Sequence, residues 1–369
     1  MEEKLNSLSK TIVNYSLDVK ENDRVLITTQ TSEANYLIKC LIKEIVNNKG
    51  IPFVRIENQS LDAALLELTN KSRINEIKKH KQFDIDNFDC FISIRYSIND
   101  FESSNVKASI RREIGDAIKE IDHVRINERR WVLLNYPSNL DAYKANMKTD
   151  DFKLFGINAM CIAYDKMYKD ILPLKEVMEN TKKVRIVGVN TDITFSIEGM
   201  PAIPCCGKYN IPDGEIYTAP IKDSVNGIIT FNTKNPYRGY VFSNISLKLR
   251  DGKIIEAKAS NNTDKLNEIL DIDDGARYIG EFAIGLNPFI KNPMGDILFD
   301  EKIIGSIHFT PGQAYYDAYN GNDSSIHFDL VLIEREEYGG GELYFDDVLV
   351  RKNGKFVLDK LKHLNYENK

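Results

Sequence analysis

Two histidines in the C-terminal half stand where they could bind a metal. His308 ends a predicted strand before a Thr-Pro-Gly turn, and His327 lies in the run 324–331, which overlaps another predicted strand. Asp329 follows His327 by two residues, so the two side chains share one face of an extended segment. Imidazole suits zinc, cobalt or iron, and a carboxylate adds negative charge. The pair is a candidate half-site for a divalent metal, while a hydrogen-bonded structural pair would use the same residue types.

Three glutamates extend this set. Glu281 stands in the otherwise apolar run 278–285, where a carboxylate is costly unless it is paired or metal-bound. Glu215 precedes a short predicted strand, and Glu301 follows Leu-Phe-Asp. The structural alternative is a buried ion pair for Glu281, a turn carboxylate that binds backbone amides for Glu215, and a solvated turn acid for Glu301. Two adjacent divalent ions need about this many ligands, and a water that both ions share becomes a nucleophile near neutral pH. The set predicts hydrolysis of an unactivated bond such as a peptide.

Two further roles complete the predicted chemistry. Glu215 or Glu281 would accept the proton of the attacking water. Tyr315, seven residues after His308, is a candidate donor to a developing oxyanion, with a packed loop aromatic as the alternative. The adjacent Cys205 and Cys206 are poorly placed to share one zinc, and we expect plain burial for both.

The first half of the chain alternates helical and strand patterns. Apolar residues at helical spacing predict helices, and β-branched runs between polar turns predict strands. The predicted order is helix 3–17, strand 24–29, helix 33–48, strand 51–56, a helix near 60–70 and strand 88–94. This order predicts a doubly wound, mostly parallel α/β sheet. No glycine-rich phosphate loop follows the first strand, so a dinucleotide or ATP function is unsupported.

From about residue 183 the pattern becomes rich in strands. Predicted strands include 184–189, 193–197, 227–231, 246–249, 277–285, 303–308 and 326–333, with a short helix at 262–272 and a hairpin at 343–357. We expect an α/β domain over residues 1–182 and a strand-rich α+β domain, carrying the metal ligands, over 183–369.

Composition narrows the possible functions. A formal net charge of −6 argues against a general nucleic-acid binder, which normally shows a basic face. Five scattered cysteines without a framework spacing fit a reducing compartment. The polar start has no signal-peptide pattern, and no apolar run reaches the ~18 residues of a membrane span. A cytoplasmic protein without nucleic-acid or membrane partners is predicted.

Several ordered motifs carry a family resemblance. They are NIPDGEIYTAP (210–220), DDGARYIGEFAIGLNP (273–288), FDEKIIGSIHFTPGQAY (299–315) and NDSSIHFDLV (322–331), with RWVLLNYPSNLDAYKANMKTDDF (130–152) upstream. Together they resemble the thermophilic-type metallo-aminopeptidases, the family of aminopeptidases T and S. The resemblance covers most of the chain in order. This sequence departs from the family pattern in two places. The spacing between Glu301 and His308 is slightly longer, and the stretch after His308 reads FTPGQAY, where an ALG-like run is commoner in the family.

The resemblance implies a fold, a cofactor and a substrate. It implies an α/β domain followed by a strand-rich metal domain, and a homodimer. It implies two divalent ions, either zinc, cobalt, manganese or magnesium, and a peptide substrate with a free N-terminus. The family's ligands fall on Glu215, Glu281, His308, His327 and Asp329, with a further glutamate at Glu301 and the family tyrosine at Tyr315.

Two other functions remain open at this point. Ring-opening dioxygenases of the 2,5-dihydroxypyridine type resemble the same family and need one iron, which His308, His327 and Asp329 would satisfy. Glu215 and Glu281 instead favour two ions and hydrolysis. The second alternative is a non-catalytic or specialised peptide-binding homologue, against which the complete ligand set argues.

Overall fold

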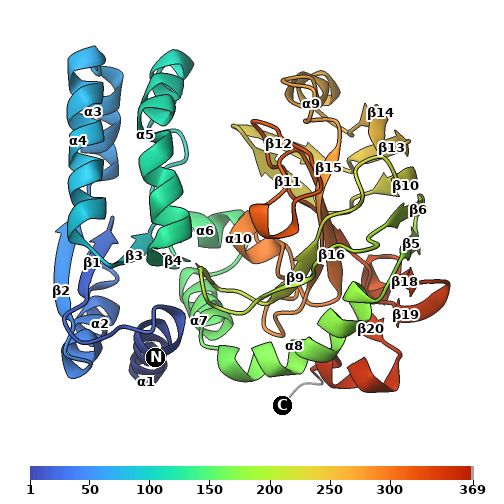
Figure 1. Ribbon diagram of the computed structural model, residues 1–369, viewed down its shortest axis with the longest axis horizontal. Helices are drawn as coiled ribbons and strands as arrows, with labels where there is room; N and C mark the ends of the chain where they lie inside the picture. The colour runs from blue at the N-terminus through green and yellow to red at the C-terminus, as the bar shows by residue number, and fades with distance from the viewer. Residues whose placement is uncertain (367–369) are drawn as a thin grey trace. The chain divides into compact units, whose positions relative to one another are not determined.

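A computed structural model describes residues 1–366 of the chain. The chain folds into two compact units, which we call the N-terminal unit (residues 1–163 and 207–212) and the C-terminal unit (residues 164–206 and 213 onward). Both are seen in Figure 1. Among the described residues, no helix combines the length and the apolar character needed to cross a membrane.

The N-terminal unit is built on a parallel sheet. Its strand order is β2-β1-β3-β4-β8, and every neighbouring pair is parallel. The strands are β1 (Arg24–Thr29), β2 (Ile51–Ile56), β3 (Cys90–Arg95), β4 (Arg130–Asn135) and β8 (Asn210–Ile211). The first two have the bounds predicted from their β-branched runs. The predicted doubly wound α/β architecture is confirmed.

Helices cover both faces of this sheet. They are α1 (Glu2–Lys10), α2 (Asn35–Asn47), α3 (Gln59–Glu67), α4 (Lys71–Asn87), α5 (Ala108–Glu128), α6 (Asn139–Lys144) and α7 (Thr149–Met160). From β1 to β2 the chain steps toward one edge of the sheet, whereas from β2 to β3 and then to β4 it steps toward the opposite edge. Right-handed crossovers therefore place α2 on one face and α4 and α5 together on the other (Figure 1). The predicted helix 3–17 is α-helical only to Lys10, and continues as a π-helix over Thr11–Ser16.

The N-terminus of α6 carries a complete capping box. The Ser138 hydroxyl accepts a hydrogen bond from the Asp141 amide at 3.1 Å, and the Asp141 carboxylate accepts one from the Ser138 amide at 3.2 Å. Ser138 is fully buried. Replacing it by alanine should destabilise the N-terminal unit by about 1 kcal/mol. Denaturant unfolding followed by the fluorescence of Trp131, the single tryptophan of the chain, measures this unit. The exposed Ser72→Ala is the matched control, and equal midpoints for both variants would contradict the assignment.

Two antiparallel sheets dominate the C-terminal unit. The larger has the order β14-β13-β10-β6-β5-β18-β19-β20, and the smaller, which we call the inner sheet, has the order β17-β16-β15-β9-β7. The larger sheet consists of β5 (Lys183–Gly188), β6 (Thr191–Ser196), β10 (Asn226–Thr230), β13 (Ser246–Arg250), β14 (Lys253–Lys258), β18 (Gly341–Phe345), β19 (Val348–Lys352) and β20 (Lys355–Phe356). The inner sheet consists of β7 (Ile203–Cys205), β9 (Glu215–Thr218), β15 (Ile279–Gly285), β16 (Ser306–Pro311) and β17 (Leu330–Ile333).

Smaller elements surround these sheets. They are helices α8 (Tyr164–Glu179), α9 (Thr263–Leu270) and α10 (Ile297–Asp300), the ribbon β11 (Lys234–Tyr237) and β12 (Tyr240–Ser243), and short 3-10 turns at Tyr316–Ala318, Glu336–Tyr338 and Asp359–Asn365.

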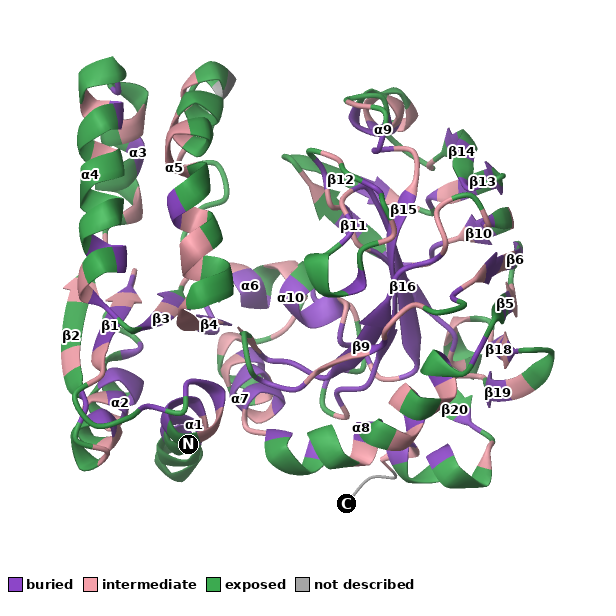
Figure 2. Ribbon diagram, in the orientation of Figure 1, coloured by how far each residue is buried: buried purple, intermediate pink, exposed green. Residues whose placement is uncertain are grey.

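The two sheets share an aromatic core. Phe195 of β6 packs against Phe282 of β15 and Phe309 of β16, with ring centroids 5.0 and 5.2 Å apart. All three rings are buried, and Figure 2 shows β15 and β16 buried along their length. Successive side chains of a strand point to opposite faces. The residues that alternate with these phenylalanines therefore lie on the other face of the inner sheet, which we call its site face.

Two predicted strands that carry site residues begin later than expected. The strand predicted over 303–308 is β16, which starts at Ser306 because Gly305, with a φ of +76°, makes the preceding turn. The strand predicted over 326–333 starts only at Leu330, and His327 forms an isolated bridge with Gly312. Before it, the hydroxyls of Ser324 and Ser325 donate to the Asp273 carboxylate at 2.7 Å, and such side-chain bonds compete with a strand ladder.

Candidate metal centre

Strand register gathers the first candidate ligands on the site face of the inner sheet. Glu281 is on β15, His308 on β16 and Glu215 on β9. Ala283 of β15 pairs directly with His308, and Gly285 pairs with Glu215. Both β15 residues are small, so the longer carboxylate and imidazole side chains can meet above them. The predicted positions in sequence thus become neighbours through ordinary antiparallel pairing.

A close backbone approach brings Glu301 to the same place. Glu301 follows α10, and the chain then passes directly beside β15. A Cβ atom on Gly285 would lie 2.3 Å from the carbonyl oxygen of Ile303 and 3.0 Å from that of Glu301. Only glycine at position 285 lets this segment approach so closely.

Glu281 lies between the two histidines. Its Oε1 atom is 3.1 Å from Nε2 of His308, and its Oε2 atom is 3.2 Å from Nε2 of His327. His308 Nε2 is also 3.7 Å from Oε2 of Glu215. Glu281 and His308 are both almost completely buried. One carboxylate therefore contacts two imidazoles, and these three side chains could together hold a divalent ion.

Neighbouring groups fix the orientation of His327 and Asp329. His327 Nδ1 is 2.9 Å from the Gln313 carbonyl, to which it must donate, so Nε2 is the nitrogen available as a ligand. That Nε2 atom is 3.1 Å from Oδ1 of Asp329, and the Thr310 hydroxyl donates to the same oxygen at 2.7 Å. These outer bonds hold both side chains toward Glu281.

A buried lysine completes the cluster. The Lys302 ammonium, with 1% of its side chain exposed, donates to Oε1 of Glu215 at 2.7 Å and also contacts the Glu301 carboxylate. Asp213 Oδ1 is 3.8 Å from the same ammonium. Lys302 therefore neutralises part of the charge of two candidate ligands.

The ionisation of these groups follows from burial and mutual contact. Burial opposes the charged form of Glu281, but hydrogen bonds from His308 and His327 outweigh it and lower the pKa of Glu281. Burial lowers the pKa of His308, yet the bond to Glu281 and the charge of Glu215 raise it to about 9. Burial raises the pKa of Glu301 to about 8, with help from Glu215. Ion pairs within the cluster thus stand in for the charge that a metal would supply.

The donor set fits divalent ions. Glu215 Oε2 and His308 Nδ1 are buried without a hydrogen-bond partner, which is costly unless another group binds there. Ligand atoms lie within 4.8 Å of one another in three groups, namely Glu215 with Glu281 and His308, Glu281 with His327 and Asp329, and Glu301 with His308 and Asp329. Imidazole and carboxylate ligands at this spacing suit zinc, cobalt or manganese.

Tyr315 lies beside this centre. Its ring is 4.6 Å from the His327 ring and 5.5 Å from the Tyr217 ring, centroid to centroid. Tyr315 is 48% exposed as a residue, but desolvation of its hydroxyl group, together with the carboxylates of Glu281 and Asp329, raises its pKa well above the usual value. The phenol therefore stays protonated and able to donate a hydrogen bond at neutral pH.

All seven residues named from the sequence lie in this one region of the C-terminal unit. Sequence reasoning missed Lys302, Thr310 and Asp213. Lys302 follows Glu301 directly, and only its position inside the apolar segment 297–307 could have marked it as buried. Cys206 is buried as expected, whereas Cys205 is only half-buried. Cys205 lies within 4.8 Å of Asp213 and Glu215, and desolvation of its thiol raises its pKa.

Fold and site define a class: a parallel α/β unit joined to an antiparallel unit with a buried centre of carboxylates and histidines. The chain belongs to the thermophilic metalloprotease (M29) family, whose model matches residues 1–356. The predicted family resemblance is therefore confirmed.

Similar proteins extend this finding. Aminopeptidase 2 of Geobacillus stearothermophilus is 30% identical over 167 residues, which cover 40% of this chain and 37% of that protein. Aminopeptidase T of Thermus thermophilus is 31% identical, with 40% of each chain covered. The chain thus aligns with about two fifths of the length of these relatives.

Two solved structures share the fold over nearly the whole chain. Wild-type AmpT from Thermus thermophilus superposes with a TM-score of 0.77 at 18% identity, covering 97% of this chain and 100% of that one. The 2,5-dihydroxypyridine dioxygenase of Pseudomonas putida KT2440 has a TM-score of 0.62 at 13% identity, covering 98% and 99%.

Proposed function

We propose that the chain is a metal-dependent aminopeptidase that releases N-terminal residues from peptides. The contact of Glu281 with both histidines carries this proposal, because it suits a ligand shared by two divalent ions. Membership of a metalloprotease family and relatives named aminopeptidases support it. A peptide substrate with a free N-terminus, a homodimer and a cytoplasmic location belong to the same proposal.

Each site residue has a proposed role. Glu215, Glu281, Glu301, His308, His327 and Asp329 would hold two divalent ions, which would supply a water of near-neutral pKa. Glu215 is our candidate general base, because Lys302 holds its Oε1 atom while Oε2 is buried without a hydrogen-bond partner. Tyr315 would donate a hydrogen bond to the oxyanion that forms at the scissile carbonyl.

The direct test combines metal content with activity. Elemental analysis of the purified protein is followed by assays on aminoacyl chromogenic substrates with added cobalt, zinc or manganese. We expect about two ions per chain and release of N-terminal residues that a chelator abolishes. No bound metal and no activity would reject the proposal.

A mononuclear iron dioxygenase is the second candidate function. His308, His327 and Asp329 offer the two histidines and one carboxylate that such an iron site needs. The fold shared with the dioxygenase structure is compatible with it. Glu281, placed between the histidines, instead favours a second ion. One iron per chain, with no peptidase activity, would support the dioxygenase.

Replacing Tyr315 by phenylalanine tests the oxyanion role. Loss of one preorganised donor should lower kcat by about 100-fold, while metal content stays unchanged. Tyr316 is the matched control, because it is 89% exposed and Tyr316→Phe should leave kcat unchanged. An unaltered kcat in Tyr315→Phe would assign this ring to packing against His327.

A further inference from the structure

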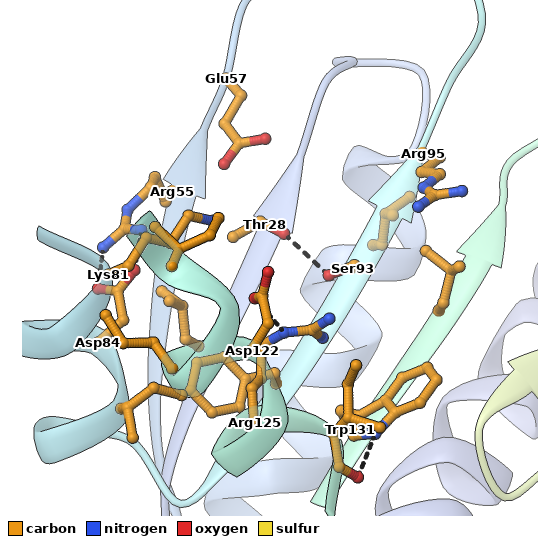
Figure 3. A pocket seen from close by; sticks show the side chains of 18 of the residues that line it. Thr28, Arg55, Glu57, Lys81, Asp84, Ser93, Arg95, Asp122, Arg125 and Trp131 are labelled. Carbon is orange, nitrogen blue, oxygen red and sulfur yellow. Dashed lines mark hydrogen bonds and ion pairs between the residues drawn. The ribbon is translucent and has the colours of Figure 1, made fainter. Parts of the chain in front are cut away.

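A cavity in the N-terminal unit is separate from the candidate metal centre. It has a volume of about 520 Å³ and lies between the parallel sheet and helices α4 and α5 (Figure 3). Two pairs of its charges satisfy each other: Arg55 forms two hydrogen bonds of 2.7 Å with Asp84, and Arg125 is 3.6 Å from Asp122. None of its lining residues is a candidate ligand, so this cavity gives no information on what the metal centre binds.

A cavity of about 70 Å³, which we call the small cavity, adjoins the candidate metal centre. The candidate ligands His327 and Asp329 line it, together with Lys234, Tyr237 and Ile297, and its whole lining belongs to the C-terminal unit. Its volume exceeds the roughly 30 Å³ share of one water molecule in the liquid, but is far below the roughly 300–1,000 Å³ of a site that holds a whole small molecule. The small cavity therefore has room for one end of a substrate whose other atoms lie at the centre.

The segment that carries Lys234 is tied to the edge strand of the inner sheet. This edge strand is β17, whose Ile333 exchanges two hydrogen bonds with the Asn232 side chain, one of 2.8 Å from Nδ2 and one of 2.9 Å to Oδ1. The Thr233 hydroxyl donates to the Val331 carbonyl at 3.0 Å. These bonds take the place of a further strand beside β17, and they fix the start of β11 next to it.

Alternation along this segment then turns Lys234 outward. Thr233 and Asn235 are buried and hydrogen-bond to each other. Successive side chains of an extended segment point to opposite faces, so Lys234, between them, faces away from this buried pair. Further along β11, Tyr237 stacks on Phe328 with ring centroids 4.2 Å apart. Both ends of β11 are therefore held, and Lys234 is exposed at the small cavity.

Lys234 is the charged group of the small cavity that remains for a substrate. Asp329 is a candidate metal ligand, and the Asp300 carboxylate accepts hydrogen bonds from the backbone amides of Met294 and Gly295. Among the side chains that the structure describes, none forms an ion pair or hydrogen bond with the Lys234 ammonium. A cation at this position attracts an anionic group of a molecule that is bound at the centre.

We propose that Lys234 binds the C-terminal carboxylate of a dipeptide, and that the chain therefore prefers dipeptides to longer peptides. This inference rests on the proposed aminopeptidase function. The carboxylate of a dipeptide lies one residue beyond the scissile bond, within reach of a cation that shares a cavity with two candidate ligands. Each added residue moves the carboxylate away by up to roughly 3.3–3.6 Å. The side chain of the second residue would lie against Tyr237 and Ile297.

Steady-state hydrolysis by the metal-loaded chain tests the proposal, with leucyl-leucine and leucyl-leucinamide as substrates. The two have the same scissile bond and differ in the charge at the C-terminus. We expect the KM of leucyl-leucine to be about fivefold lower at a similar kcat, as for an ion pair that is open to water. Higher ionic strength should reduce this preference, because salt screens exposed charges.

Variants of Lys234 assign the preference to its ammonium. Lys234→Met should raise the KM of leucyl-leucine to that of the amide, and it should leave the KM of the amide unchanged. Lys234→Arg should keep the preference, because it keeps the charge. The exposed Lys253 on β14 does not line the small cavity, and Lys253→Met is the matched control that should behave as the wild type does.

Binding without turnover provides a second measurement. An analogue of leucyl-leucine with a CH₂–NH link in place of the peptide bond is not hydrolysed, so its affinity for the metal-loaded chain can be titrated by calorimetry. We expect it to bind about fivefold more tightly than its own C-terminal amide. Lys234→Met should bind the two analogues equally.

The outcomes separate this inference from the proposed function. Equal KM values for the two substrates in the wild type, or a preference that survives in Lys234→Met, would overturn the role of Lys234. Trileucine with a KM as low as that of leucyl-leucine would overturn the preference for dipeptides. In these cases the aminopeptidase function stands, because leucine is released. No release of leucine from any of the three peptides would reject that function, and this inference with it.

Discussion

Replacing Glu281 by glutamine is expected to empty the metal centre. Glu281 contacts both histidines, and an uncharged amide cannot serve as an anionic metal ligand. Changing residues that merely orient metal ligands already costs about 10–100-fold in affinity, so losing a proposed ligand itself should cost at least about 100-fold. Metal content measured after gel filtration, and aminopeptidase activity, should fall together.

A surface substitution separates this effect from general damage. Glu256 is exposed on β14 of the same unit, and Glu256→Gln should keep both metal and activity. Glutamine is close to glutamate in shape, so Glu281→Gln should remain folded by circular dichroism. Normal metal content and activity in Glu281→Gln would show that Glu281 only forms structural bonds with the histidines.

Replacing Lys302 by methionine is expected to make the stability of the chain depend on metal. The ammonium is buried and holds the carboxylates of Glu215 and Glu301. Without it, both charges lose their partner, and breaking a buried pair in this way costs about 3–5 kcal/mol. Thermal unfolding in chelator should show this loss. Added zinc should raise the melting temperature of the variant more than that of the wild type, because two carboxylates are freed to bind cations.

The exposed Lys248 on β13 provides the comparison. Lys248→Met should unfold at the wild-type temperature with or without zinc. If Lys302→Met in chelator were as stable as the wild type, the lysine would contribute nothing to balancing these carboxylates. A variant that stays unstable in saturating zinc would place its role in packing instead.

Local patterns were sufficient to predict much of the fold. The strands at Arg24–Thr29 and Ile51–Ile56 were found at their predicted bounds, because β-branched runs end there at polar turns. The later start of β17 was not predictable, because it depends on Asp273, some fifty residues earlier in the chain. The change of the first helix to a π-helix after Lys10 has no evident signal in the sequence.

For the candidate site, residue types and their spacing predicted the candidate ligands. They did not predict the buried lysine that balances the charge of these ligands. A carboxylate in an apolar run marked Glu281, and the alternation His-x-Asp marked His327 and Asp329. Lys302 was missed because lysine normally lies at the surface, and its burial depends on a glycine across the sheet at position 285. Such pairing between distant segments is a property of the fold and leaves no local pattern.

Strand β15 is constrained in a way that bears on how this sequence can change. Glu281 and Ala283 face the candidate centre, while Phe282 faces the aromatic core between the sheets. Inserting or deleting one residue would turn every side chain over, placing a carboxylate among phenylalanines and a phenylalanine among the ligands. Substitutions on one face leave the other intact. Evolution along this strand can therefore proceed by substitution of single residues. An insertion or deletion would instead disrupt both the packing of the aromatic core and the candidate metal centre.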